Sequence, residues 1–154
     1  MKTIILEGIA TSGKSTIINK LEFAFPESQK VKVVPESETI MAIVDNTDKG
    51  VALSHLKSVI EDAYKTPSHV VIFDRLYLTH VFRVGGTMND FASIEDLLTP
   101  HEPTTVYLEV DEAAIPERVE IASRHRDPSW KDYILTKGQT FTEIADYYIK
   151  QQRK

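Results

Sequence analysis

The feature that most constrains this chain is a glycine-rich motif near its start, Gly8 to Ser15, which reads GIATSGKS. It matches the pattern G-x-x-x-x-G-K-[ST]. An apolar run, Lys2 to Leu6, precedes the motif, and the segment Ser15 to Phe25 follows it with apolar residues at helical spacing. A strand, a loop and a helix in this order form a phosphate-binding site from backbone N–H groups and a helix N-terminus. The motif therefore predicts binding of a nucleoside triphosphate.

The individual positions of the motif have distinct predicted roles. Gly8 and Gly13 let the backbone curl around an anion, Lys14 reaches the β- and γ-phosphates, and Ser15 is placed to bind Mg²⁺. ATP and Mg²⁺ are therefore the expected cofactors. The residues expected to contact the nucleotide are Gly8, Ile9, Ala10, Thr11, Ser12, Gly13, Lys14, Ser15 and Thr16.

The size and composition of the chain limit what it can be. Its 154 residues, of which 42% are hydrophobic, predict one domain spanning 1–154. The net charge of −5 argues against broad electrostatic attraction to duplex nucleic acid or to a membrane. The absence of cysteine excludes disulfides and thiol catalysis, and no apolar stretch reaches transmembrane length. We expect a soluble, cytoplasmic protein, for which a homodimer is compatible with these features.

Short β-branched runs alternate with helix-compatible segments along the chain, which is typical of an α/β fold with a parallel sheet. The pattern predicts a compact three-layer arrangement with a mainly parallel sheet of four or five strands. Four strands can be assigned: Lys2 to Leu6, Val31 to Val34, His69 to Phe73, and Thr104 to Val110. Helices are expected at Ser15 to Phe25, Leu53 to Tyr64, Leu76 to Val84, Asp90 to Leu98, within Glu112 to Ser123, and at Thr142 to Gln152.

Two charged residues, Asp74 and Arg75, follow the apolar strand that ends at Phe73. In open α/β sheets, ligands bind at the carboxyl ends of the strands, so both side chains are expected near the phosphate loop. Asp74 is predicted to support Mg²⁺ together with Ser15, and Arg75 to clamp the acceptor or its phosphate. The alternative is a surface ion pair between the two residues.

Glu36 follows the second strand and Pro35, which restricts the backbone at the strand exit. A carboxylate near an attacking hydroxyl group can orient it and accept its proton. Glu36 is therefore a candidate base for phosphoryl transfer. Glu38, two residues later, is a competing candidate, and a solvated loop residue is the simpler alternative for either.

A cationic stretch containing Arg118, Arg124, His125 and Arg126 stands out in a chain whose net charge is negative. A lid around 117–130 could close over the phosphates, exclude water and stabilise the charge of the transferring group. Arg124 and Arg126 are the candidate lid residues, although spacing alone does not select one arginine. A solvated helix end would carry similar charges.

These segments together resemble the P-loop nucleoside and nucleotide kinases, particularly the deoxynucleoside kinase and thymidylate kinase group. The stretch from Leu6 to Thr16 is similar to the phosphate loop of that group. Pro35-Glu36 resembles its P-E element, whose glutamate would be the base, and Asp74-Arg75 resembles its [DE]-R pair. Ala10 replaces the aspartate that is usual in thymidylate kinases, which favours the nucleoside kinases.

The resemblance implies an ATP-dependent phosphotransferase of nucleotide metabolism. Its catalytic residues would be Lys14, Glu36, Asp74, Arg75, Arg124 and Arg126. The expected acceptor is a (deoxy)nucleoside, and the first alternative is a (deoxy)nucleoside monophosphate. A P-loop NTPase that acts as a conformational switch and a polynucleotide 5′-kinase are further alternatives.

Overall fold

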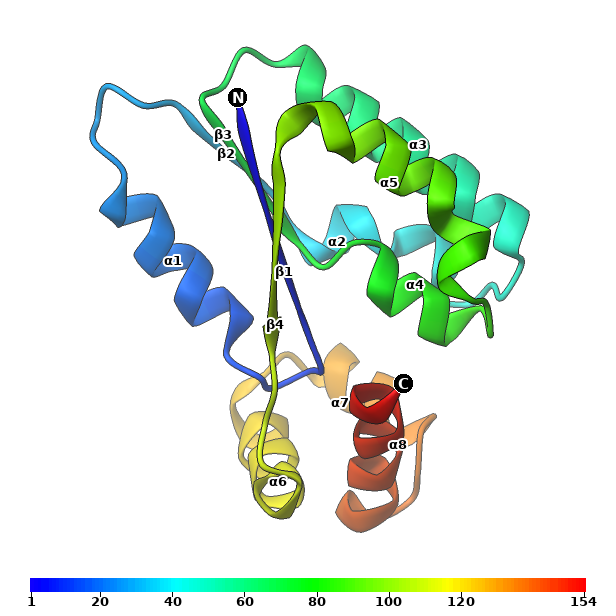
Figure 1. Cartoon of the computed structure of the whole chain (residues 1–154). Helices are drawn as coiled ribbons and strands as arrows, with labels where there is room; N and C mark the ends of the chain where they lie inside the picture. The colour runs from blue at the N-terminus through cyan, green and yellow to red at the C-terminus, as the bar shows by residue number, and fades with distance from the viewer. The chain divides into compact units, whose positions relative to one another are not determined.

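A computed structural model describes the backbone of residues 1–154 and every side chain except that of Met41 (Figure 1). The chain forms two compact units, each described here by itself. The first contains Met1–Glu7 and Lys14–Tyr107, and the second contains Gly8–Gly13 and Leu108–Lys154. The phosphate-loop motif thus passes from the second unit into the first between Gly13 and Lys14.

The sheet has four strands in the order β2-β3-β1-β4, all parallel. β1 and β2 lie on either side of β3. In this register Phe73 of β3 pairs with Ile5 of β1 and with Val34 of β2. The four predicted strands are confirmed, and their observed ends differ from the predicted ones by at most two residues. The strands are β1 (Lys2–Gly8), β2 (Val31–Val34), β3 (Val70–Asp74) and β4 (Pro103–Leu108).

Helices cover both faces of the sheet in the first unit (Figure 1). Successive side chains of a strand point to opposite faces, so Val71 and Phe73 join a different core cluster from Val70 and Ile72. The first cluster packs under α3 (Lys49–Lys65) and α5 (Ala92–Leu98), and the second packs under α1 (Lys14–Ala24). Because both faces are covered, β3 is apolar along most of its length. This is the predicted three-layer α/β fold.

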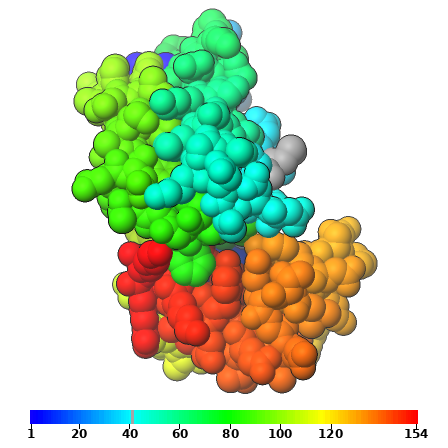
Figure 2. Space-filling model, turned by 90° about the vertical axis from the view of Figure 1, so that its right-hand side faces the viewer, coloured from blue at the N-terminus to red at the C-terminus, as the bar shows by residue number. Residues whose placement is uncertain are grey.

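Short helical segments connect the main elements of the first unit. Figure 2 shows α3 directly beside the green segment that contains α5. The predicted helix from Asp90 to Leu98 is instead a 3₁₀ turn followed by α5. A helix directly after Pro35 was not expected, because four residues are too few to show helical periodicity. The segments are α2 (Glu36–Thr39), η1 (Met41–Ile43), α4 (Tyr77–Arg83), η2 (Met88–Phe91) and η3 (Thr99–His101).

α4 carries a buried histidine, His80, whose side chain is fully shielded from solvent. Its Nδ1 lies 2.6 Å from the carbonyl oxygen of Leu76. Because a carbonyl oxygen only accepts hydrogen bonds, Nδ1 carries the proton. Burial lowers the pKa of His80 from 6.5 to about 4, so the ring is neutral at physiological pH.

The second unit is helical and encloses part of the glycine-rich loop. It contains η4 (Glu112–Ala114), α6 (Ile115–His125), α7 (Pro128–Leu135) and α8 (Phe141–Arg153), of which α7 was not predicted. Figure 2 shows α7 and α8 side by side, in orange and red. Ile9 and Ala10 from the loop join the buried side chains of these helices, which are Val110, Ile115, Val119, Ile134, Ile144, Ala145 and Tyr148.

Caps in the second unit explain where its helices begin. Pro116 occupies the first turn of α6, where its missing N–H group costs no hydrogen bond. The Asp127 side chain accepts a hydrogen bond from the Ser129 N–H and so caps α7. The expected lid, 117–130, therefore contains most of α6 and the start of α7, and its closure over a nucleotide remains a prediction. No helix in the described part of the chain combines the length and apolarity needed to cross a membrane.

Candidate phosphotransfer site

The two glycines of the glycine-rich loop have positive φ angles, which let the backbone curl. Gly8 and Gly13 have φ angles of 142° and 96°, and Thr11 has a φ of 70°. A Cβ atom at Gly8 would lie 2.7 Å from the carbonyl oxygen of Leu108, so only glycine fits there. At Gly13 a Cβ atom would meet no atom within 4 Å among the described residues. The loop therefore leaves open space beside Gly13, which suits an approaching phosphate.

Polar groups of the loop also fit an anionic ligand. The side-chain oxygens of Thr11 and Ser12 are buried and have no hydrogen-bond partner within the described residues. Buried hydroxyl groups of this kind are usually satisfied by a partner, and phosphate oxygens would supply one. Arg118 on α6 donates a hydrogen bond from Nη1 to the carbonyl oxygen of Thr11 at 3.2 Å. It is the arginine of the predicted cationic stretch that contacts the loop backbone.

The first unit buries a cluster of charged side chains where β1, β3 and α1 meet. Lys14, Asp74 and Arg75 are buried, and the Glu36 side chain is 37% exposed. Lys14 is the first residue of α1, Asp74 ends β3, and Glu36 begins α2. The charges of Arg75, Glu36 and Asp74 shift the pKa of Lys14, and the charges of Arg75 and Lys14 lower the pKa of Glu36. The structure therefore brings these four predicted catalytic residues together in one unit.

An ion pair joins the candidate base to the arginine after β3. The Nε atom of Arg75 lies 3.1 Å from Oε2 of Glu36. Burial alone would raise the pKa of Glu36, but Arg75 and Lys14 outweigh burial and lower it. Burial likewise opposes the charge on Arg75, yet the carboxylates of Glu36 and Glu7 raise its pKa. Glu36 is thus ionised at neutral pH and able to accept a proton.

Lys14 has a strongly lowered pKa in this cluster. Burial, together with the charge of Arg75, lowers its pKa from 10.5 to about 8. The carboxylates of Glu36 and Asp74 oppose this shift. A lysine with a pKa near 8 is partly neutral in mildly alkaline solution, so its charge responds strongly to an added anion.

Asp74 and Ser15 are the residues that fit the predicted magnesium site. The backbone of Asp74 is fixed at the end of β3, where its carbonyl oxygen accepts a hydrogen bond from Thr39 Oγ1 at 3.0 Å. Ser15 lies exposed in the first turn of α1. No group of three acidic or histidine side chains among the described residues could hold a metal ion alone. A carboxylate and a hydroxyl match Mg²⁺, which keeps water ligands and completes its shell with substrate phosphates.

No role was predicted for Glu7, a buried carboxylate of the first unit that accepts three hydrogen bonds. Its Oε1 accepts hydrogen bonds from the backbone N–H groups of Leu76 and Leu78, at 2.8 and 3.1 Å. Its Oε2 accepts a hydrogen bond from the Thr79 hydroxyl at 2.9 Å. Burial raises the pKa of Glu7, and these hydrogen bonds partly oppose the rise. An acidic residue inside an otherwise apolar strand was the signal that could have identified it.

The predicted lid arginines belong to the second unit. Arg124 pairs with Glu120 one turn earlier on α6. The guanidinium of Arg126 lies 4.6 Å from the ring centroid of Trp130, a cation–π contact. Both arginines are exposed. Their proposed contact with a transferring phosphoryl group therefore stays a prediction.

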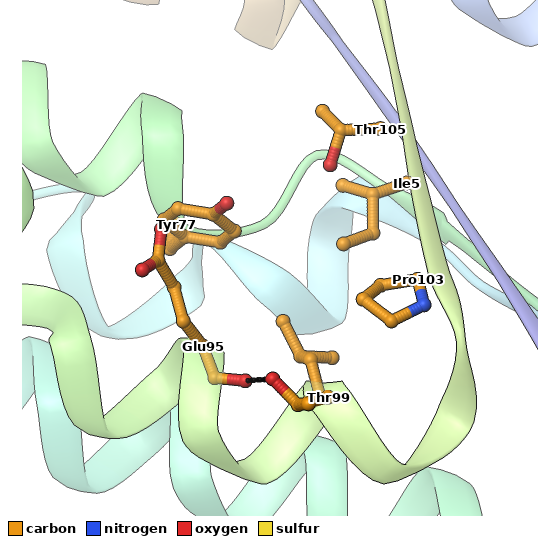
Figure 3. A pocket seen from close by; sticks show the side chains of 7 residues that line it. Ile5, Tyr77, Glu95, Thr99, Pro103 and Thr105 are labelled. Atoms are coloured by element: carbon orange, nitrogen blue, oxygen red, sulfur yellow. Dashed lines mark hydrogen bonds between the residues drawn. The ribbon is translucent and has the colours of Figure 1, made fainter.

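A separate pocket of about 300 Å³ opens in the first unit beside α4, α5 and β4 (Figure 3). The Thr99 hydroxyl at its edge donates a hydrogen bond to the carbonyl oxygen of Glu95. Burial and the nearby Glu95 carboxylate raise the pKa of Tyr77, so its phenol stays protonated. None of the predicted site residues is among the described side chains that line this pocket, which are Ile5, Tyr77, Glu95, Leu98, Thr99, Pro103 and Thr105.

Comparisons with known proteins support the fold. No family model matches the chain, and no curated protein matches it in sequence. The crystal structure of the protein APE1195 has a TM-score of 0.58 at 18% identity, covering 96% of this chain and 78% of that one. Polyphosphate kinase 2 from Arthrobacter aurescens TC1 has a TM-score of 0.57 at 16% identity, covering 99% of this chain and 57% of that one. The chain therefore has the three-layer fold seen in P-loop kinases.

Proposed function

We propose that this protein is a P-loop kinase that transfers the γ-phosphoryl group of ATP to the hydroxyl group of a small acceptor, a (deoxy)nucleoside. The observation that carries the proposal is the buried cluster of Lys14, Asp74 and Arg75 beside the partly exposed Glu36. A surface ion pair would not require burial of three charged side chains, because burying a charge is costly. Within this cluster, Lys14 directly follows the phosphate loop in the chain.

Each charged group has a role in this reaction. The loop backbone and Lys14 bind the phosphates, while Ser15 and Asp74 would hold Mg²⁺, which neutralises phosphate charge when bound. Glu36 orients the acceptor hydroxyl and accepts its proton as the oxygen forms a bond to the γ-phosphorus and ADP leaves. Arg75 positions the acceptor side, and Arg124 or Arg126 stabilises the developing charge.

Charge and chemistry support the proposed acceptor class. Glu36 is the partly exposed member of the cluster, so it is the carboxylate that an entering hydroxyl group can reach. The net charge of −5 disfavours a long polyanionic acceptor. A nucleoside monophosphate is the second candidate, because the guanidinium of Arg75 is suited to bidentate binding of an acceptor phosphate.

The test is transfer of radiolabelled γ-phosphate from ATP in the presence of Mg²⁺. The acceptors are nucleosides, nucleoside monophosphates, a 5′-hydroxyl oligonucleotide, and polyphosphate, which the name of one structural neighbour suggests. A labelled nucleoside supports the proposal, and a labelled monophosphate or oligonucleotide selects one of the alternatives. Release of phosphate without a labelled acceptor, with different conformations in ADP and ATP, indicates a switch NTPase.

A matched pair of lysine variants controls this assay. Lys14→Ala should abolish transfer, because it removes the side chain predicted to reach the β- and γ-phosphates. Lys20→Ala removes an exposed lysine from the same helix and should leave transfer unchanged. Equal activity of both variants and the unaltered protein would contradict a role of the motif in catalysis.

A further inference from the structure

The turn that follows β3 has an unusual backbone that something must hold in place. Arg75 has a φ of 65°, in the left-handed region that non-glycine residues rarely adopt. Leu76, which precedes α4, provides no side-chain cap for that helix. Strained conformations of this kind persist only where surrounding contacts fix them.

Those contacts come from Glu7 at the end of β1. Its Oε1 accepts both the Leu76 and the Leu78 N–H groups, so a carboxylate from another strand provides the cap that α4 lacks. The Arg75 N–H group donates to the Leu6 carbonyl oxygen at 2.9 Å, which ties the same turn to β1. β1 therefore fixes the turn on both sides of Arg75.

A second branch of the network reaches the guanidinium itself. Thr79 Oγ1 donates to Glu7 Oε2 at 2.9 Å and accepts from Arg75 Nη1 at 3.2 Å. The Nε atom of the same guanidinium lies 3.1 Å from Glu36 Oε2. Glu7 and Thr79 are both buried, at 1% and 3% exposure, so solvent does not weaken these hydrogen bonds.

We propose that Glu7 and Thr79 are positioning residues that hold Arg75, and through it Glu36, in the geometry required for phosphoryl transfer. Glu7 fixes the backbone after β3. The Thr79 hydroxyl links the Glu7 carboxylate to the Arg75 guanidinium through two hydrogen bonds. This inference rests on the proposed kinase function, since Arg75 and Glu36 act on the acceptor. It adds two residues whose effect on the reaction is indirect.

The decisive variants act on the relay and spare the backbone cap. Thr79→Val keeps the shape of the side chain but removes the hydroxyl that links Glu7 to Arg75, whereas Thr79→Ser keeps the hydroxyl. Thr3→Val is the matched control, because Thr3 is also a buried threonine of this unit, and its hydroxyl lies 2.8 Å from Tyr64 Oη rather than in the Glu7 network. Chemical denaturation of each variant reports the fraction that is folded.

We expect Thr79→Val to lower kcat about tenfold or more, because the reacting groups lose their alignment, with Kd for Mg²⁺–ATP changed less than about twofold. Thr79→Ser should restore kcat to within about threefold of the unaltered protein. Thr3→Val should lower stability without lowering kcat. Equal kcat in Thr79→Val and the unaltered protein, or equal losses in Thr79→Val and Thr3→Val, would overturn the proposal.

A measurement without turnover separates this inference from the proposed function. The ¹⁵Nε–Hε signal of Arg75, assigned by its loss in Arg75→Lys, reports rotation of the guanidinium. Rotation should be slow in the unaltered protein and in Thr79→Ser, and faster in Thr79→Val and Glu7→Gln. Unchanged rotation in Thr79→Val and Glu7→Gln overturns the positioning role, whereas an unaltered protein that transfers phosphate to no acceptor overturns the kinase function.

Discussion

Nη1 of Arg118 lies 3.2 Å from the carbonyl oxygen of Thr11 and donates a hydrogen bond to it. Thr11 has a φ of 70°, in the region that non-glycine residues rarely adopt. The Arg118 side chain therefore contacts the loop at a residue with a strained backbone. The backbone of the glycine-rich loop is thus contacted by a side chain more than a hundred residues later in the chain.

We predict that Arg118→Ala weakens binding of Mg²⁺–ATP. Loss of one hydrogen bond of about 1 kcal/mol corresponds to a rise of roughly fivefold in Kd, measurable by titration calorimetry. Arg118→Lys should recover part of the affinity. Lys131→Ala, which removes an exposed cation from α7, is the control for a general effect of charge. An unchanged Kd in Arg118→Ala would show that the loop keeps its shape unaided.

Glu36→Gln should separate catalysis from nucleotide binding. The variant keeps the shape of the side chain but cannot accept the proton of the acceptor, so kcat should fall about 100-fold or more. Kd for Mg²⁺–ATP should change less than about twofold, because Glu36 does not bind the donor. Glu38→Gln in the same short helix, α2, is the matched control. A larger loss in Glu38→Gln would transfer the role of base to Glu38.

Binding of ATP should be accompanied by proton uptake in mildly alkaline solution. The pKa of Lys14 is about 8 before binding, and a bound phosphate anion raises it because the charged form gains a partner. Between about pH 8 and pH 10, binding therefore protonates Lys14, and the affinity falls as the pH rises. Calorimetry in buffers of different ionisation enthalpy measures the protons taken up. The uptake should disappear in Lys14→Arg, whose side chain stays charged, and should persist in Lys20→Arg.

The stability of the first unit should fall in acid because of His80. Its pKa is about 4 in the folded protein and near 6.5 when unfolded, so the unfolded state binds the proton more readily. Above about pH 6.5, His80 adds no pH dependence to the stability. As the pH drops from about 6.5 to 4, the free energy of unfolding falls by about 3 kcal/mol. Urea denaturation at several pH values measures the slope.

Two histidine variants test whether His80 causes the fall in stability at acidic pH. His80→Gln should flatten the slope between pH 6.5 and 4, whatever the stability of the variant at neutral pH. His125→Gln, at an exposed position of α6, is the matched control. Parallel pH profiles for the unaltered protein and His80→Gln would show that His80 is not the responsible group.

The sheet was predictable from the sequence because its strands are short and apolar, and polar residues mark their ends. Val70 to Phe73 is buried on both faces, which leaves a continuous apolar run that a reader can recognise. α2 and α7 were missed for a different reason. α2 has four residues, and α7 begins within a charged stretch, so neither shows an apolar helical period of useful length.

The candidate site was predictable in its chemistry but not in its connections. Lys14, Glu36, Asp74 and Arg75 follow strands or the glycine loop, and topology alone brings such residues to one edge of a parallel sheet. The hydrogen-bond partners of Glu7 lie at least 69 positions away in the chain. The partner of Arg118 lies 107 positions away. No local spacing encodes such contacts, because they depend on how the folded elements pack.

Ile9 and Ala10 lie in the segment Gly8–Gly13, which belongs to the second unit, and they complete the core formed by α6, α7 and α8. A proteolytic break between Tyr107 and Leu108 would therefore not release two self-sufficient pieces. The carboxyl-terminal fragment would lack the buried side chain of Ile9. The amino-terminal fragment would contain Ile9 but would lack the helices that pack on it. The predicted phosphate-binding loop and the core of the helical unit thus share the same short peptide, so we expect a substitution at Ile9 to disturb both.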